Sequence, residues 1–127
     1  MPQPERAFAH TLAVKAGDDL SALEALLDRG GISDAIIGFH AQQAVEKALK
    51  AVLVAGGWEL RRTHDIRFLL DELESTGIEL PPRLAEADWL TPWATELRYD
   101  DFADDPLDRQ LALATAQAAV ALAAGHG

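Results

Sequence analysis

The sequence predicts an all-α protein folded as an antiparallel up-and-down bundle of four to five helices. Apolar residues recur three and four positions apart through each long segment, which is the spacing of one helix face. No segment alternates apolar and polar residues with a period of two, so no strand is expected. Glycine pairs and prolines divide the chain into segments of helical length, and short links favour antiparallel neighbours. We expect residues 1–127 to form a single domain.

Two long helices are expected in the first half of the chain. One runs from Glu5 to about Asp28 and ends at the glycine pair 30–31. The other has Ser33 as its N-cap and continues to Val54, before the glycine pair 56–57. The apolar side chains expected to face the core from the first helix are Phe8, Leu12, Leu20, Leu23, Leu26 and Leu27.

A third helix is expected after the sequence RRTHD. Thr63 is its predicted N-cap, Asp65 favours the positive end of the helix dipole, and Gly77 stops it. The segment from Arg83 to about Tyr99 follows, and Pro92 must break or kink it.

The broken segment predicts a short helix to Leu90 and a second one from Thr91 or Pro92. The last helix is expected to have Asp105 as its cap and Pro106 at its first position, and to reach about Ala124. Its expected apolar side is formed by Leu107, Leu111, Leu113, Ala114, Ala118 and Leu122.

The composition limits the function classes. The formal net charge of −10 argues against a general surface for duplex DNA, because such binding rests on neutralising phosphates. There is no cysteine, no long apolar run and no signal-peptide pattern, so we expect a cytoplasmic protein with no membrane span. From His40 to Arg67, however, five basic residues outnumber three acidic ones. This region is compatible with a small anionic ligand, a phosphate or an acidic partner, and also with a solvated polar face.

A polar stripe runs along the second predicted helix. Its members are three and four residues apart, so they share one face of an otherwise apolar helix. Glu46 precedes Lys50 by four residues and is expected to pair with it, for about 0.2–0.5 kcal/mol. The stripe is either a binding or subunit interface or a solubilising face. It consists of His40, Gln43, Lys47 and Lys50.

Two further residues are candidates for chemistry. His64 is either part of a helix cap or a hydrogen-bond donor and general base. Arg98 is suited to bidentate binding of phosphate or carboxylate, or is neutralised by the six acidic residues between positions 96 and 108. The four histidines lack the spacing of a metal site and there is no phosphate-binding glycine loop, so we expect no metal and no cofactor.

Three pieces of sequence stand in a fixed order: FHAQQAVEKALKAVL, RRTHDI and WATELRYDD. Together they resemble the HEPN domain family. The first matches the family's helix-two signature, the second the start of its third helix, and Arg98-Tyr99 its arginine–tyrosine element. The resemblance covers about residues 5–123. It implies a helical bundle that is commonly a homodimer, and stand-alone prokaryotic members are often encoded beside a minimal nucleotidyltransferase, forming a toxin–antitoxin-like pair.

The resemblance also bears on catalysis. Other branches of the family are metal-independent ribonucleases, whose motif is an arginine, four to six residues and then a histidine. Ala103, Asp104 and Asp105 stand where that histidine would follow Arg98, and the nearest match, from Arg6 to His10, is one residue short.

The sequence therefore favours a non-catalytic subunit that pairs with a nucleotidyltransferase, binds a nucleotide-like anion, or both. The alternative is a ribonuclease toxin acting on RNA phosphates, with Arg98 and His64 as its candidate catalytic residues. The expected ligand- or partner-binding residues are Gln43, Glu46, Lys47, Lys50, His64, Arg98 and Tyr99.

Overall fold

The computed structural model describes residues 4–94 and 106–126, and the regular structure of these residues is entirely helical. The long helices are α1 (Pro4–Arg29), α2 (Asp34–Ala55) and α5 (Arg109–His126). Between α2 and α5 lie α3 (Ile66–Ser75), the single turn α4 (Pro82–Ala85) and the 3-10 helix η1 (Ala87–Trp93). The prediction of an all-α bundle is confirmed.

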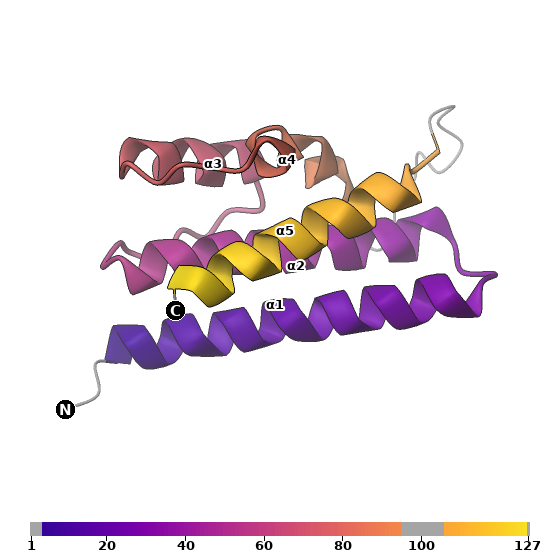
Figure 1. The fold of residues 1–127 in the computed structure, drawn as a ribbon, viewed down its shortest axis with the longest axis horizontal. Helices are drawn as coiled ribbons and strands as arrows, with labels where there is room; N and C mark the ends of the chain where they lie inside the picture. The colour runs from indigo at the N-terminus through magenta and orange to yellow at the C-terminus, as the bar shows by residue number, and fades with distance from the viewer. Residues whose placement is uncertain (1–3, 95–105, 127) are drawn as a thin grey trace.

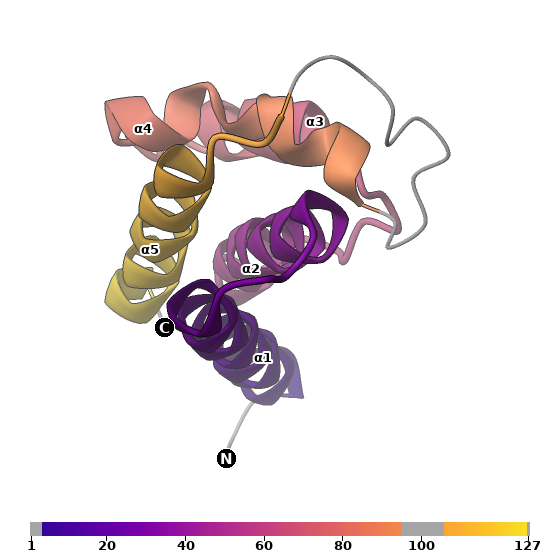
Figure 2. The ribbon, with the colours of Figure 1, turned by 90° about the vertical axis from the view of Figure 1, so that its right-hand side faces the viewer.

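Helix α2 occupies the middle of the molecule. It packs against α1, α5, α3 and η1, and 14 of its 22 residues are buried. Figure 1 shows α1 and α2 as an antiparallel pair with α5 lying across them. Figure 2 shows α3 and α4 in a layer on the side of α2 opposite to α1. None of the described helices combines the length and the hydropathy needed to cross a membrane.

Local hydrogen bonds set the starts of α2 and α3. Ser33 Oγ accepts from Ile36 N at 3.4 Å, as the sequence predicts for an N-cap. Before α3, the cap is Asp65, whose carboxylate accepts from Phe68 N at 3.4 Å. The prediction of Thr63 as the cap is wrong, because its hydroxyl accepts from Asp65 N and so shapes the turn before the helix.

The segments before and after the undescribed residues 95–105 differ from expectation. Pro92 lies inside η1, and neither it nor Thr91 begins a helix in the described residues. Helix α5 begins at Arg109 and not at Pro106, because Asp108 Oδ1 accepts from Leu111 N at 3.0 Å and caps it. Asp105, the predicted cap, lies outside the described residues.

Two large apolar side chains that were expected in the core are exposed. Phe8 points away from the core because Ala9 and Ala16 occupy the buried side of α1. Leu111 is exposed because α5 buries a face of small residues in place of a leucine stripe. Small side chains allow a helix to approach its neighbour closely. The buried residues of α5 are Ala112, Thr115, Ala116, Ala119 and Ala123.

The start of α5 is tied to the turn between α1 and α2. Arg109 Nε donates to Asp34 Oδ1 at 2.8 Å, and another guanidinium nitrogen of Arg109 donates to the carbonyl of Ile32 at 2.6 Å. The second oxygen of Asp34 accepts from Leu107 N at 3.1 Å. We call these contacts the Asp34–Arg109 clamp, and they join segments about seventy residues apart in the sequence.

Candidate functional site

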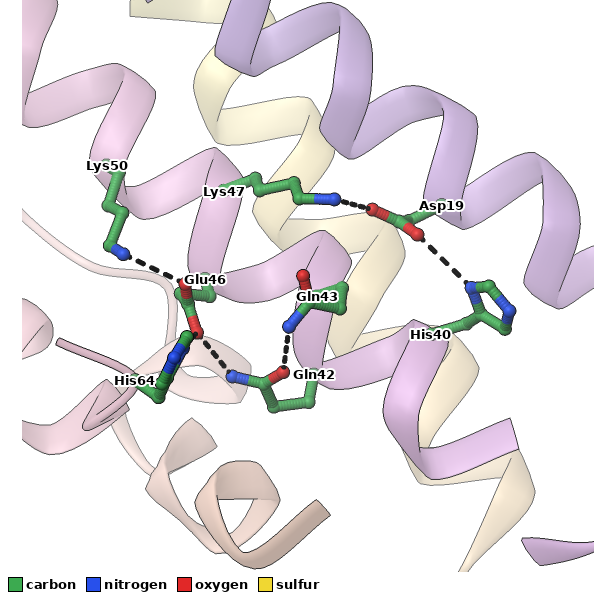
Figure 3. Close-up of polar contacts among 8 residues, drawn as sticks. All are labelled: Asp19, His40, Gln42, Gln43, Glu46, Lys47, Lys50 and His64. Atoms are coloured by element: carbon green, nitrogen blue, oxygen red, sulfur yellow. Dashed lines mark hydrogen bonds and ion pairs between the residues drawn. The ribbon is translucent and has the colours of Figure 1, made fainter. Parts of the chain in front are cut away.

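The polar side chains of α2 gather around two carboxylates. The first, Asp19, comes from α1. Its Oδ2 accepts from Lys47 Nζ at 2.7 Å, and its Oδ1 lies 3.1 Å from His40 Nδ1. These three residues form the Asp19 cluster, which joins α1 to α2 (Figure 3). Since the Asp19 side chain is only 13% exposed, the pair with Lys47 is partly shielded from water.

The second carboxylate, Glu46, lies on α2 itself, and only 6% of its side chain is exposed. Its Oε1 accepts from Gln42 Nε2 at 2.7 Å and lies 2.8 Å from His64 Nδ1. Its Oε2 accepts from Lys50 Nζ at 2.9 Å. The amide oxygen of Gln42 accepts in turn from Gln43 Nε2 at 2.7 Å. We call these five residues the Glu46 cluster (Figure 3).

The environment of Glu46 keeps it ionised. Burial alone raises the pKa of the carboxyl group, because the charged form loses its hydration. Hydrogen bonds from Lys50, His64 and Gln42, together with the charge of Lys50, lower the pKa by more, so that it lies below the ordinary value. Glu46 is therefore a buried anion at neutral pH with donors on both of its oxygens.

His64 has one ring nitrogen directed at this anion. An ionised carboxylate only accepts hydrogen bonds, so Nδ1 of His64 carries the proton and donates to Glu46. Nε2 lies on the far side of the ring, and 69% of the His64 side chain is exposed. The pair has the geometry of a carboxylate–histidine dyad, which fixes the imidazole in one tautomer and directs Nε2 away from the carboxylate.

The backbone around His64 is held from both sides. Thr63 Oγ1 accepts from Asp65 N at 3.0 Å, and Asp65 caps α3. Ile66 N donates to Thr91 Oγ1 at 3.1 Å, which joins the start of α3 to η1. Because these bonds fix the residues on each side of His64, its imidazole is held over Glu46 by the fold.

The structure brings four of the predicted binding residues, Gln43, Glu46, Lys50 and His64, into the Glu46 cluster, and it changes the meaning of the polar stripe. The stripe is not a row of unpaired cations, because Asp19 neutralises Lys47 and Glu46 neutralises Lys50. The Glu46–Lys50 pair has the expected spacing, but it is buried rather than on the surface. Lys47 belongs to the separate Asp19 cluster, and Arg98 and Tyr99 lie outside the described residues.

Sequence reasoning missed two members of these clusters. Gln42 has a sequence signal, because it precedes Glu46 by four residues and so faces it on the helix. Asp19 has none, because its partners on α2 lie 21 and 28 residues further along the chain. Within residues 4–94 and 106–126, no three histidine or carboxylate side chains are placed to hold a metal ion.

The fold and the site define a helical-bundle protein whose central helix carries a buried carboxylate and a histidine bound to it. A family model, the HEPN domain, matches residues 9–125, which is nearly the whole chain. The chain therefore belongs to the HEPN family, as its three sequence signatures indicate. No curated protein and no solved structure matches the chain significantly.

Proposed function

We propose that this HEPN protein is a non-catalytic subunit that pairs with a nucleotidyltransferase in a toxin–antitoxin-like system. We further propose that residues 58–68, here called the docking segment, contact the partner. The observation that carries this proposal is the exposure of three large apolar side chains within these eleven residues: Trp58, Leu60 and Phe68.

The composition of the docking segment suits a protein interface. Arg61 and Arg62 lie between the apolar residues and are exposed, and Arg61 is paired with Glu72 at 3.1 Å. Aromatic residues and arginine are enriched in the centres of protein interfaces, where they contribute most of the binding energy. A partner with an acidic, partly apolar surface would complement this segment.

The Glu46–His64 dyad supports the same assignment. It attaches the docking segment to α2, and the Asp65 cap fixes the end of the segment to α3. A segment that is already ordered loses less conformational entropy when it binds. The dyad thus has a positioning role in this proposal and needs no chemistry of its own.

A nucleotide-like anion is a weaker choice of ligand for the polar stripe itself. It would have to compete with Asp19 for Lys47 and with Glu46 for Lys50. Breaking a buried ion pair to bind a phosphate leaves a carboxylate without its partner, which is costly. The neutralised lysines therefore favour a protein partner over an anion at this face.

The test is to identify the protein encoded beside this gene and, where it is a nucleotidyltransferase, to co-express the two, purify them and titrate them by calorimetry. We expect a stable complex, and we expect Trp58→Ala with Phe68→Ala to weaken it about tenfold or more. Val14→Ala removes an exposed apolar side chain from α1 and serves as the matched control. A neighbouring gene of another class, or a lone homodimer that ignores the enzyme, would contradict the proposal.

The ribonuclease alternative has one structural observation in its favour. His64 is held in the tautomer whose Nε2 can accept a proton, as a general base must. Incubation of the purified protein with total RNA tests this reading against His64→Gln and Arg98→Ala. Cleavage that both substitutions abolish would establish it and overturn the non-catalytic assignment.

A further inference from the structure

The start of α1 and the ends of α2 and α5 lie at the same end of the bundle (Figure 1). A group of basic side chains gathers there. A cavity of about 300 Å³ opens there between the first turns of α1 and the ends of α2 and α5. Three of its six lining residues are basic, and none is acidic. The lining residues are Arg6, Ala9, His10, Ala55, Gly125 and His126.

The helices explain why these residues meet. Arg6 and His10 are four residues apart on α1, so they share one face. His126 is in the last turn of α5 and approaches the same space. The other lining residues have small side chains or none, which leaves room between the three basic groups.

The basic groups of this cavity are available to a ligand. Among the described residues, Arg6 and His10 make no side-chain hydrogen bond or ion pair. The Nδ1 of His126 donates to the carbonyl of Leu122 at 2.9 Å, which leaves its Nε2 for a ligand. In the polar stripe, by contrast, each lysine already holds a carboxylate.

We propose that the cavity lined by Arg6, His10 and His126 binds a phosphomonoester group. A guanidinium presents a planar fork of donors that matches two phosphate oxygens, a ring N–H of His10 can donate to a third, and Nε2 of His126 can accept from a P–OH group. The Arg6 guanidinium places a fixed positive charge beside the phosphate. The volume is at the lower end of the range of small-molecule sites, about 300–1,000 Å³, and accommodates a phosphate with part of its substituent.

This site is separate from the docking segment, so the two proposals stand or fall independently. The experiment is a titration of the full chain with inorganic phosphate at pH 6.5, followed by the imidazole NMR signals. We expect saturable shifts for His10 and His126. His40 and His64, which are bound to carboxylates elsewhere, serve as internal references and are expected to stay unchanged.

Variants and analogues identify what is recognised. Arg6→Ala is expected to weaken phosphate binding about tenfold, because it removes charge-assisted hydrogen bonds. Arg29→Ala removes the same charge from the other end of α1 and is expected to have little effect. Circular dichroism checks that each variant is folded.

Adenosine monophosphate is expected to bind at least as tightly as phosphate, and adenosine is expected not to bind. Equal binding of adenosine would overturn the assignment of a phosphate group. Absence of a saturable shift at His10 and His126, or equal losses in Arg6→Ala and Arg29→Ala, would overturn the site itself.

Discussion

The surroundings of Glu46 show how a folded protein stabilises a single buried charge. Placing an ion inside a helical bundle is unfavourable unless hydrogen bonds and an opposite charge replace its hydration. Lys50 supplies the charge, and Gln42 and His64 supply further donors. A well-packed apolar residue would often serve stability equally well, so stability alone does not explain the carboxylate. At the surface, this carboxylate holds the imidazole of His64.

Removing this carboxylate should leave a nearly buried ammonium group without a partner. We expect Glu46→Ala to lower the free energy of unfolding by about 3 kcal/mol or more, because Lys50 and Gln42 both lose their acceptor. Urea denaturation measures the change. Glu79→Ala, at an exposed position, is the control and should change it by less than about 0.5 kcal/mol.

The lowered pKa of Glu46 predicts a pH dependence of stability with a definite sign. Between the pKa of the folded state and the ordinary value of about 4.3, the unfolded chain binds more protons, so stability rises with pH. The contribution is fully present above the ordinary value and is lost as the pH falls through the folded-state pKa.

The comparison that isolates this effect is wild type against Glu46→Gln, unfolded by urea between pH 3 and pH 7. The other carboxyl groups contribute nearly equally to both proteins and cancel in the difference. We expect the stability advantage of the wild type to shrink at the acidic end. A difference that stays constant with pH would contradict the assignment of an ionised Glu46.

At the scale of elements, α2 meets η1 through a glycine. A Cβ added to Gly38 would overlap the ring of Trp93, at atoms near the base of the side chain. The indole therefore packs directly on the backbone of α2, and only glycine allows this approach. Gly17, inside α1, has nothing within 4 Å of an added Cβ.

These two glycines predict opposite effects of one substitution. Gly17→Ala should stabilise the protein by about 1 kcal/mol, because alanine has the higher helix propensity. Gly38→Ala gains the same propensity, but it must displace Trp93, and overpacking costs about 1–3 kcal/mol. We therefore expect a net loss for Gly38→Ala together with a change in tryptophan fluorescence. Thermal unfolding of the two variants side by side tests the pair.

The elements also show what sequence reasoning can reach. The helices and the Ser33 cap were predictable because their signals lie within a few residues of one another. The start of α5 was predicted too early because aspartates stand on both sides of Pro106, at positions 105 and 108, and either can cap a helix. Only the structure shows that Asp108 is the cap. The role of Asp19 was beyond reach because it depends on how α1 packs against α2. Within the candidate site, residue types and spacing pointed to Glu46 and His64, but not to their contact.

At the scale of the whole molecule, the Asp34–Arg109 clamp connects the start of α5 to the turn between α1 and α2. We expect Arg109→Ala to lower the free energy of unfolding by about 2 kcal/mol, because it removes hydrogen bonds between charged groups. Arg109→Lys keeps the charge but loses the planar fork, and should fall between wild type and alanine. Arg83→Ala, at an exposed position in α4, is the control in the same urea series.

The alanine face of α5 gives this clamp a second consequence. Ala112, Ala116, Ala119 and Ala123 follow one another at steps of four, three and four residues. Ala119 lies seven residues after Ala112, and Ala123 lies seven residues after Ala116. A shift of the helix by seven residues therefore places alanine on alanine, so the buried surface nearly repeats along its length. Such a surface holds a helix close to α2 but discriminates poorly between positions along it. Arg109 is the single arginine of α5, so its contacts can form at only one position of the helix. The clamp therefore determines the position of α5 along α2 as well as the strength of its attachment.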